Sequence, residues 1–303
     1  VTADAARRRL PPAFAARCLG TAESGPQILL AALLLRDRAR QVPGLGEVCE
    51  SPFAPYYASL PRGISTPLGW PPGDLAGLVG THAAELLEAR CEDLVQAFKV
   101  VRAEVEDLRD ASWDDFLWAV TSVTSRNFRD EVGSTCLLPF VDLFNHDPIA
   151  GYFTSYEWRR GRFVLRSERA ISACSEIFLS YGPLGNSRLL SGYGFALEAN
   201  EEQNGYCPDE ASIHVPIDLD SGDPRWRWIR ESGYQVQGRH VKAVVTHARG
   251  VFELMSLLRA LSAEGGEADE ICRAPGQGVR AISVRNELRA AAALFVAAAR
   301  GAA

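Results

Sequence analysis

The feature that most constrains this 303-residue chain is a pair of short motifs in its middle. The first, Asp142-Leu143-Phe144-Asn145-His146, ends an apolar run that begins at Leu137. The second, Tyr181-Gly182-Pro183, follows residues 176–180, whose apolar character predicts a short buried strand. Alone, the first motif is typical of a turn and the second of a core tyrosine after a strand. Two such motifs, 35 residues apart, are hard to obtain together by chance.

The chain before these motifs has a helical pattern. Residues 26–40 and about 74–109 carry apolar positions at helical spacing, and residues 41–72, rich in Pro and Gly, read as an ordered loop segment. Ser112 begins a further helix, because the residues after it resemble a capping box with Asp in place of Glu.

The centre of the chain reads as β structure and the end as helices. Residues 152–158 and 162–166 predict a hairpin around Arg159-Arg160-Gly161. Beyond the second motif we expect the following: a helical turn at 186–191, a polar linker at 201–205, a strand at 212–219, and amphipathic helices at 240–263 and 283–300.

The motifs and this layout resemble the SET-domain methyltransferases, and within them the group of Rubisco large-subunit lysine methyltransferase. The resemblance is strongest over residues 112–204. It implies an α+β fold, in which the C-terminal half of a β-rich, pseudo-knotted SET core carries a helical insert and a C-terminal helical domain. The boundaries implied are 1–24 for a remnant of the N-terminal SET region, 25–120 for the insert, 121–204 for the core half, and 205–303 for a helical substrate-binding-like domain.

The same resemblance implies an S-adenosylmethionine-dependent protein-lysine N-methyltransferase. Its chemistry needs a neutral amine in line with the methyl group, whereas a lysine with a pKa near 10.4 is mostly charged at pH 7. A desolvated channel beside a positive sulfonium lowers that pKa, and positioning of the two reactants lowers the barrier further. No metal is required, and no metal ligands are expected.

The family's functional residues map onto this sequence at ten positions. Tyr181 is the expected catalytic residue. The expected cofactor-binding residues are Asn145, His146, Ser125, Tyr193 and Asp142, and the expected walls of the substrate channel are Arg126, Phe128, Leu179 and Phe195.

Several of these positions also have an ordinary structural interpretation. Arg126 is equally consistent with a polar helix end. Asp142 either pairs with Arg126 across the site or caps a loop. Aromatic residues such as Tyr193 are otherwise simply core. A histidine-methylating relative is an alternative, although the bulky apolar Phe128 favours lysine.

One element of the family is not found. Members carry a Gly-rich segment before the insert that contacts the methyl donor, whereas this chain starts at Val1 with no such signal. We therefore expect a product truncated at its N-terminus that binds the donor weakly. The alternative function is a non-catalytic SET-derived protein-interaction module.

Composition excludes other classes of function. The net charge of −6 provides no general attraction for nucleic acid. Seven scattered cysteines without a CxxC pair indicate neither a zinc site nor a disulfide framework. The longest apolar run, residues 28–35, is too short to span a membrane, and no signal peptide is visible. We expect a monomer that acts on a protein substrate inside the cell, in the cytoplasm or nucleus, with the plastid as an alternative.

Overall fold

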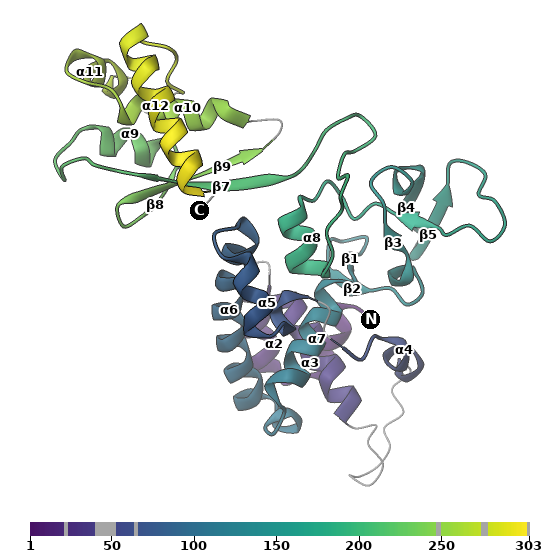
Figure 1. Cartoon of the computed structure of the whole chain (residues 1–303). Helices are drawn as coiled ribbons and strands as arrows, with labels where there is room; N and C mark the ends of the chain where they lie inside the picture. The colour runs from purple at the N-terminus through teal and green to yellow at the C-terminus, as the bar shows by residue number, and fades with distance from the viewer. Residues whose placement is uncertain (21–23, 40–52, 64–65, 247–249, 274–277, 302–303) are drawn as a thin grey trace. The chain divides into compact units, whose positions relative to one another are not determined.

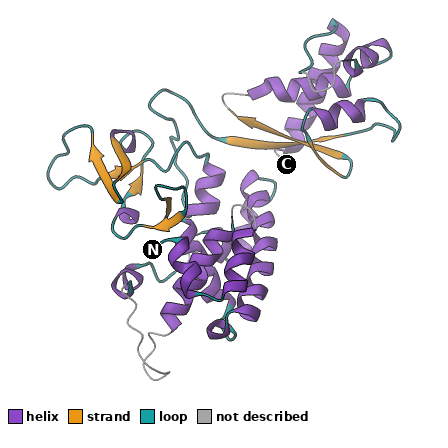
Figure 2. Cartoon of the chain, turned by 180° about the vertical axis from the view of Figure 1, so that it is seen from behind, coloured by secondary structure: helices purple, strands orange, loops and turns teal. Residues whose placement is uncertain are grey.

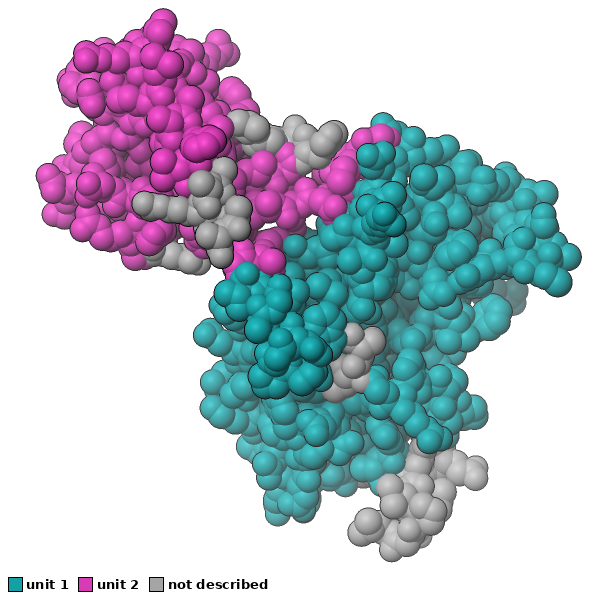
Figure 3. All heavy atoms as spheres, viewed as in Figure 1, with its two compact units in different colours: residues 1–79, 83–204 teal, residues 80–82, 205–303 magenta. Residues whose placement is uncertain are grey.

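The computed structural model describes residues 1–20, 24–39, 53–63, 66–246, 250–273 and 278–301. Two compact units make up the chain (Figure 3). The first comprises residues 1–79 and 83–204, and the second comprises residues 80–82 and 205–303.

The first unit is built around α3 (Gly25–Ala39), whose residues 28–35 are buried on every side. A helix that is apolar all round needs neighbours on all faces. The helices that pack most extensively on it are α1 (Ala3–Arg9), α2 (Pro12–Gly20) and α7 (Trp113–Thr124). Figure 1 shows α2 and α7 beside it. The other helices of this part are α4 (Ala54–Ser59), α5 (Pro72–Leu75) and α6 (His82–Glu104), with 3₁₀ turns η1 (Pro67–Gly69), η2 (Ala76–Leu78) and η3 (Glu106–Leu108).

Helix α7 carries the chain from this helical core to the site. The Ser112 hydroxyl accepts a hydrogen bond from the Asp115 amide (3.1 Å), which confirms the predicted N-cap. Buried residues from Phe116 to Val123 pack the helix onto α3. The two residues that follow the helix, Ser125 and Arg126, are therefore held in a fixed position and direction.

Short strand pairs follow (Figure 2). β1 (Asn127–Arg129) pairs with β2 (Thr135–Leu137), and β3 (Asn145–His146) pairs with β6 (Phe178–Leu179). β4 (Thr154–Arg159) and β5 (Arg162–Ser167) form the predicted hairpin, and their turn residues Arg160 and Gly161 both have positive φ, as a type I′ turn requires. The remaining elements are η4 (Val141–Leu143), η5 (Gly151–Phe153) and α8 (Asn186–Tyr193).

The second unit mixes helices and strands, where the sequence predicted mainly helices. Its antiparallel sheet has the order β7-β9-β8, from β7 (Glu210–Pro216), β9 (His240–Thr246) and β8 (Gln235–Gln237). The prediction of one helix over 240–263 was wrong in its first part. Val241 and Ala243 are buried at a period of two, a strand signal that the longer apolar run after it obscured. The helices are α9 (Arg225–Glu231), α10 (Gly250–Leu261), α11 (Gly266–Cys272) and α12 (Val284–Gly301).

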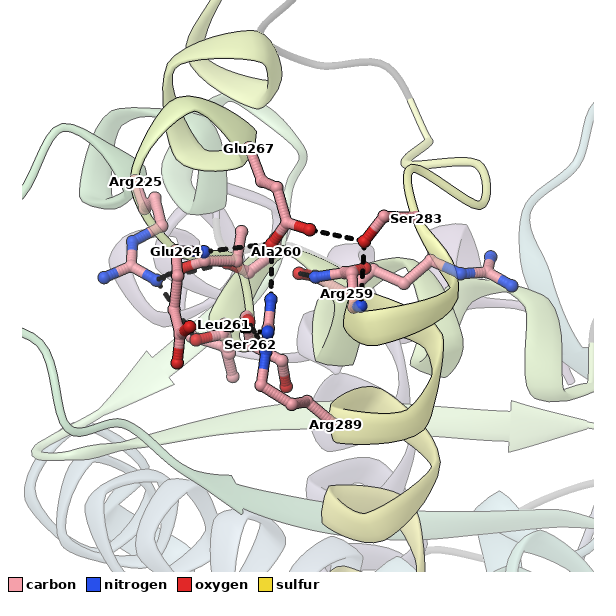
Figure 4. Close-up of polar contacts among 11 residues, drawn as sticks. Arg225, Arg259, Ala260, Leu261, Ser262, Glu264, Glu267, Ser283 and Arg289 are labelled. Carbon is pink, nitrogen blue, oxygen red and sulfur yellow. Dashed lines mark hydrogen bonds and ion pairs between the residues drawn. The ribbon is translucent and has the colours of Figure 1, made fainter.

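Arginine side chains join these helices (Figure 4). Arg225 donates to the carbonyl oxygens of Leu261 (3.1 Å) and Ala263 (2.9 Å), which lie at the C-terminal end of α10. These carbonyls have no partner within the helix, so the guanidinium acts as its C-cap. Arg289 of α12 donates to the Ser262 carbonyl (2.7 Å) in the same loop. None of the described helices is long and apolar enough to cross a membrane.

Candidate functional site

The two sequence motifs lie side by side in the structure. β3 and β6 are parallel, with Asn145 opposite Phe178 and His146 opposite Leu179. The Asp147 amide donates to the Leu179 carbonyl (3.2 Å), and the Tyr181 amide donates to His146 Nδ1 (3.1 Å). Hydrogen bonds on both sides of the pair therefore hold the Asn-His loop against the Tyr-Gly-Pro turn.

Gly151 allows the backbones to approach this closely. A Cβ atom at this position would lie 2.4 Å from the Leu179 carbonyl carbon and 2.4 Å from the Ser180 nitrogen. No real Cβ contact is so short, and both neighbours are backbone atoms that cannot rotate away. The junction between the two motifs thus depends on the absence of a side chain at residue 151.

Aromatic rings are stacked over the junction. The Tyr181 ring lies between the rings of His146 (centroids 5.1 Å apart) and Tyr193 (4.8 Å apart), and both pairs are stacked. Phe195 lies against all three, with centroid distances of 6.2 to 6.5 Å. This packing fixes the direction of the Tyr181 hydroxyl, which donates to the Phe144 carbonyl (2.8 Å).

The protonation states of these groups follow from their burial. Burial raises the pKa of Tyr181 to about 12, so its hydroxyl is a proton donor at neutral pH. Burial lowers the pKa of His146, so the ring is neutral. The ring nitrogen Nδ1 lies 3.1 Å from the Tyr181 amide and 3.4 Å from the Leu179 carbonyl oxygen, whereas Nε2 is buried and has no partner among the described residues.

Asp142 is the buried charge of the site. The Tyr56 hydroxyl donates to its Oδ2 (2.6 Å), and Arg126 Nη1 lies 3.9 Å from the same oxygen. Arg126 also donates to the Asp142 carbonyl (2.7 Å), so Asp142 both pairs with Arg126 and orders the loop. Burial raises the pKa of the Asp142 carboxyl, while the hydrogen bond from Tyr56 and the charge of Arg126 act in the opposite direction.

Two cavities adjoin at these side chains. Five residues line both: Ser125, Arg126, Asp142, Tyr181 and Tyr193. The first cavity, of about 200 Å³, extends between residues that include Thr66, Asn145 and Phe195. The second, of about 160 Å³, extends between residues that include Phe128, Leu179 and Tyr156.

All ten residues selected from the sequence meet here. Nine of them line one or both cavities, and His146 supports Tyr181 from behind. Asn145 and Ser125 make bonds that the sequence did not predict: Asn145 Nδ2 donates to Glu176 (2.6 Å), and the Ser125 hydroxyl donates to the Thr121 carbonyl (2.8 Å).

Sequence analysis missed three residues of the site, Tyr56, Thr66 and Tyr156. Tyr56 lies on α4 and Thr66 directly precedes η1, both within the stretch that the sequence predicted to be a loop segment, and no local pattern marks them. Tyr156 could have been found, since alternation along the predicted hairpin puts it on one face with Trp158.

The arrangement suits two ligands that meet end to end. The shared wall carries the phenol of Tyr181 and the guanidinium of Arg126, and the buried carboxylate of Asp142 lies behind it, 3.9 Å from Arg126. The Phe128, Leu179 and Tyr156 side chains give the second cavity apolar walls, suited to the stem of a long side chain. Within the described residues, no group of three His, Cys, Asp or Glu side chains could hold a metal ion.

Solved structures share this architecture. The SET domain of LSMT bound to lysine and AdoHcy matches with a TM-score of 0.71 and 20% identity, over 97% of this chain and 70% of that one. The chain has the SET fold. Rubisco LSMT bound to AdoMet matches with a TM-score of 0.64 and 16% identity, over 97% of this chain and 63% of that one. The α+β fold and the resemblance to the LSMT group are confirmed.

Curated proteins with a SET domain also match in sequence. A ribosomal lysine N-methyltransferase of Schizosaccharomyces pombe is 28% identical over 50% of this chain and 29% of its own length. SET domain-containing protein 4 of Mus musculus is 30% identical over 50% of this chain and 39% of its own length. An actin-histidine N-methyltransferase of Danio rerio is 27% identical over 61% of this chain and 35% of its own length.

The chain spans well under half the length of these curated relatives. No family model matches the chain.

Proposed function

We propose that this SET-fold chain is an S-adenosylmethionine-dependent protein-lysine N-methyltransferase. The observation that carries the proposal is the pair of adjoining cavities that share Tyr181, Tyr193 and Arg126. A transfer between two bound molecules needs two sites with one common wall, and this wall holds an oriented hydroxyl. The solved SET structures bound to lysine, AdoHcy or AdoMet, and the lysine methyltransferases among the relatives, support the same chemistry.

The first cavity is the proposed donor site. Its lining fits the amino-acid end of S-adenosylmethionine, because Arg126 offers a cation to a carboxylate, and Asp142, whose buried carboxylate lies 3.9 Å from Arg126, is a further proposed donor-binding residue. Asn145, His146, Ser125 and Tyr193 are the further proposed donor-binding residues. When bound, the donor supplies an electrophilic methyl group on a positive sulfur.

The second cavity is the proposed lysine channel. Phe128 and Leu179 surround the stem of the target side chain, and Phe195 and Arg126 complete the wall near the donor. Apolar walls disfavour the charged ammonium, so they lower the pKa of the amine toward the reactive neutral form. Tyr181 is the proposed catalytic residue, and its hydroxyl orients the amine toward the methyl group.

The proposed target is a lysine side chain of another protein. Ribosomal proteins are the first class to test, since one relative in fission yeast is named for ribosomal lysine methylation. The actin-histidine relative makes histidine the alternative acceptor, and the apolar Phe128 side of the channel favours lysine.

The organisation of the chain around these cavities is part of the proposal. Residues 1–24 are the remnant of the N-terminal SET region, 25–120 the insert, 121–204 the core half and 205–303 the substrate-binding domain. A monomer in the cytoplasm or nucleus is the proposed working form.

A labelling experiment tests the function. The chain is incubated with methyl-labelled S-adenosylmethionine and a cell lysate, and labelled proteins are identified by mass spectrometry. We expect label on lysine Nζ. Label on histidine only would replace the acceptor, and the absence of label at saturating donor would contradict the enzymatic function.

A further inference from the structure

The hairpin of β4 and β5 (Figure 1) carries three arginines at its tip, Arg159, Arg160 and Arg162. All three are exposed, and within the described part of the chain their side chains make no ion pair or hydrogen bond. The whole chain has a net charge of −6, so three adjacent cations run against its composition. We call these three residues the arginine tip.

The arginine tip lowers the stability of the hairpin that carries it. Arg159 and Arg162 lie directly opposite each other in the register of the two strands, where like charges are destabilising. Arg160 has a φ of 52° in the type I′ turn, a conformation that Asn or Gly adopts more easily than a long side chain. Each of these choices departs from the most stable hairpin sequence, and each adds a positive charge.

The acidic side chains of β4 and of the β1–β2 turn leave this charge uncompensated. Glu157 pairs with Arg166 (3.7 Å), further from the turn. Asp130 accepts hydrogen bonds from two backbone amides of its own turn (2.7 and 3.1 Å), and Glu131 is exposed without an ion pair among the described residues. A departure from local sequence rules that nothing in the fold compensates is typical of a functional surface.

The same hairpin forms part of the wall of the second cavity. Tyr156 of β4 lines that cavity, and its ring packs edge-on against Phe128, another wall residue (centroids 6.0 Å apart). Arg159 lies three residues further along β4, which is about 10 Å at the rise of a strand. An extended substrate chain advances by the same distance per residue. About three residues therefore separate a lysine in the cavity from a residue at the arginine tip.

We propose that the arginine tip is a docking surface for an acidic segment of the protein substrate, about three residues from the target lysine. The proposal deepens the proposed function and rests on it, because that function places the lysine in the second cavity. Guanidinium groups match carboxylates in charge and in geometry. A nucleic acid fits less well, since three cations neutralise few phosphates and the net charge of −6 provides no wider attraction.

Labelling of lysate proteins by the whole chain is the first part of the test. The chain is incubated with methyl-labelled S-adenosylmethionine, and the sequences around the labelled lysines are determined. We expect Asp or Glu at about the third position from these lysines. Peptides copied from the labelled sites are then compared, by kcat/KM, with counterparts in which Asn and Gln replace the acidic residues.

Variants of the arginine tip are the second part. Arg160→Asn removes a charge and gives the turn a residue that it prefers, so this variant should be at least as stable in urea as the unmodified chain. Combined with Arg159→Thr and Arg162→Thr, it should lower kcat/KM for the acidic peptides about tenfold and leave the amide peptides within about twofold. The preference of the unmodified chain should disappear in about 1 M salt, where charges are screened beyond about 3 Å.

Two controls accompany these variants. Arg159→Lys, Arg160→Lys and Arg162→Lys together keep the charge and should keep most of the preference. Arg8→Gln removes an exposed arginine from α1, which packs on α3, and should change neither class of peptide.

The outcomes separate the inference from the proposed function. A loss confined to the acidic peptides supports the docking surface. An equal effect on both classes of peptide, no effect, or labelled lysines without acidic neighbours overturns it while the function stands. Binding of a fluorescent single-stranded RNA that the tip variant abolishes, with no preference among peptides, overturns it in favour of nucleic acid. If the unmodified chain labels no lysine, the proposed function fails and the inference fails with it.

Discussion

Adding one methyl group at residue 151 should disable the site without touching any of its functional side chains. In Gly151→Ala the new Cβ would start 2.4 Å from two backbone atoms of Leu179 and Ser180, whereas an ordinary contact begins at 3.4 Å. One of the backbones must therefore retreat by about 1 Å, the difference between these distances. Overpacking of this kind costs about 1 to 3 kcal/mol of unfolding free energy.

The displacement of the backbone at Ser180 should also move the Tyr181 side chain, because Tyr181 follows Ser180 directly. A displacement of 1 Å in a positioned group lowers rates by roughly a hundredfold. We therefore expect Gly151→Ala to lose about 1 to 3 kcal/mol in urea unfolding and roughly a hundredfold in methyl transfer.

Gly73→Ala is the control for this prediction. Gly73 lies in α5, and a Cβ there would meet nothing within 4 Å. That variant should keep both stability and activity. If Gly151→Ala matched Gly73→Ala in both measurements, the close approach of the two motifs would not be what shapes the site.

Three further substitutions probe other parts of the chain. Tyr181→Phe should slow single-turnover methyl transfer by at least about a hundredfold and leave S-adenosylhomocysteine affinity within twofold, because the lost hydroxyl acts on the amine; unchanged turnover would rule out its catalytic role. Asp142 has a folded-state pKa above its ordinary value near 3.9, so its contribution to stability is lost as pH rises through that raised pKa. Asp142→Asn should therefore gain stability relative to the unmodified chain as pH rises from about 4 to 7 in urea unfolding, and a pH-independent difference would contradict the raised pKa. Arg225→Met should lower the unfolding free energy of the second unit by about 2 to 3 kcal/mol, because it uncaps α10 and removes the ion pair with Asp223; a loss below about 0.5 kcal/mol would show that the cap is dispensable.

The sequence predicted what depends on local pattern and on motif. The β4–β5 hairpin, the Ser112 cap and the short strand before Tyr181 were all predicted, because turn residues, capping residues and alternation act over a few positions. The ten site residues were selected for a different reason: the motifs that contain them resemble those of a known family.

What the sequence did not predict depends on long-range packing. Tyr56 meets Asp142 across 86 positions, and nothing in its neighbourhood distinguishes it from Tyr57. Strand β9 was missed because its short alternation of apolar and polar residues is followed closely in the sequence by the longer apolar pattern of α10. The roles of the site residues and the domain boundaries stay predictions, which the experiments above address.

The parallel pair β3–β6 has two residues in each strand, yet it joins positions 33 apart along the chain. Closing such a segment lowers the entropy of the chain before any stabilising contact has formed. The β4–β5 hairpin inside it, in contrast, forms between residues that are close in the sequence. We expect the hairpin to form first and this junction late. Both cavities are bounded by the two ends of that closure, so neither cavity exists in a half-folded chain. Under the proposed function, the chain therefore gains its donor site only when folding is complete, and incompletely folded molecules transfer no methyl groups.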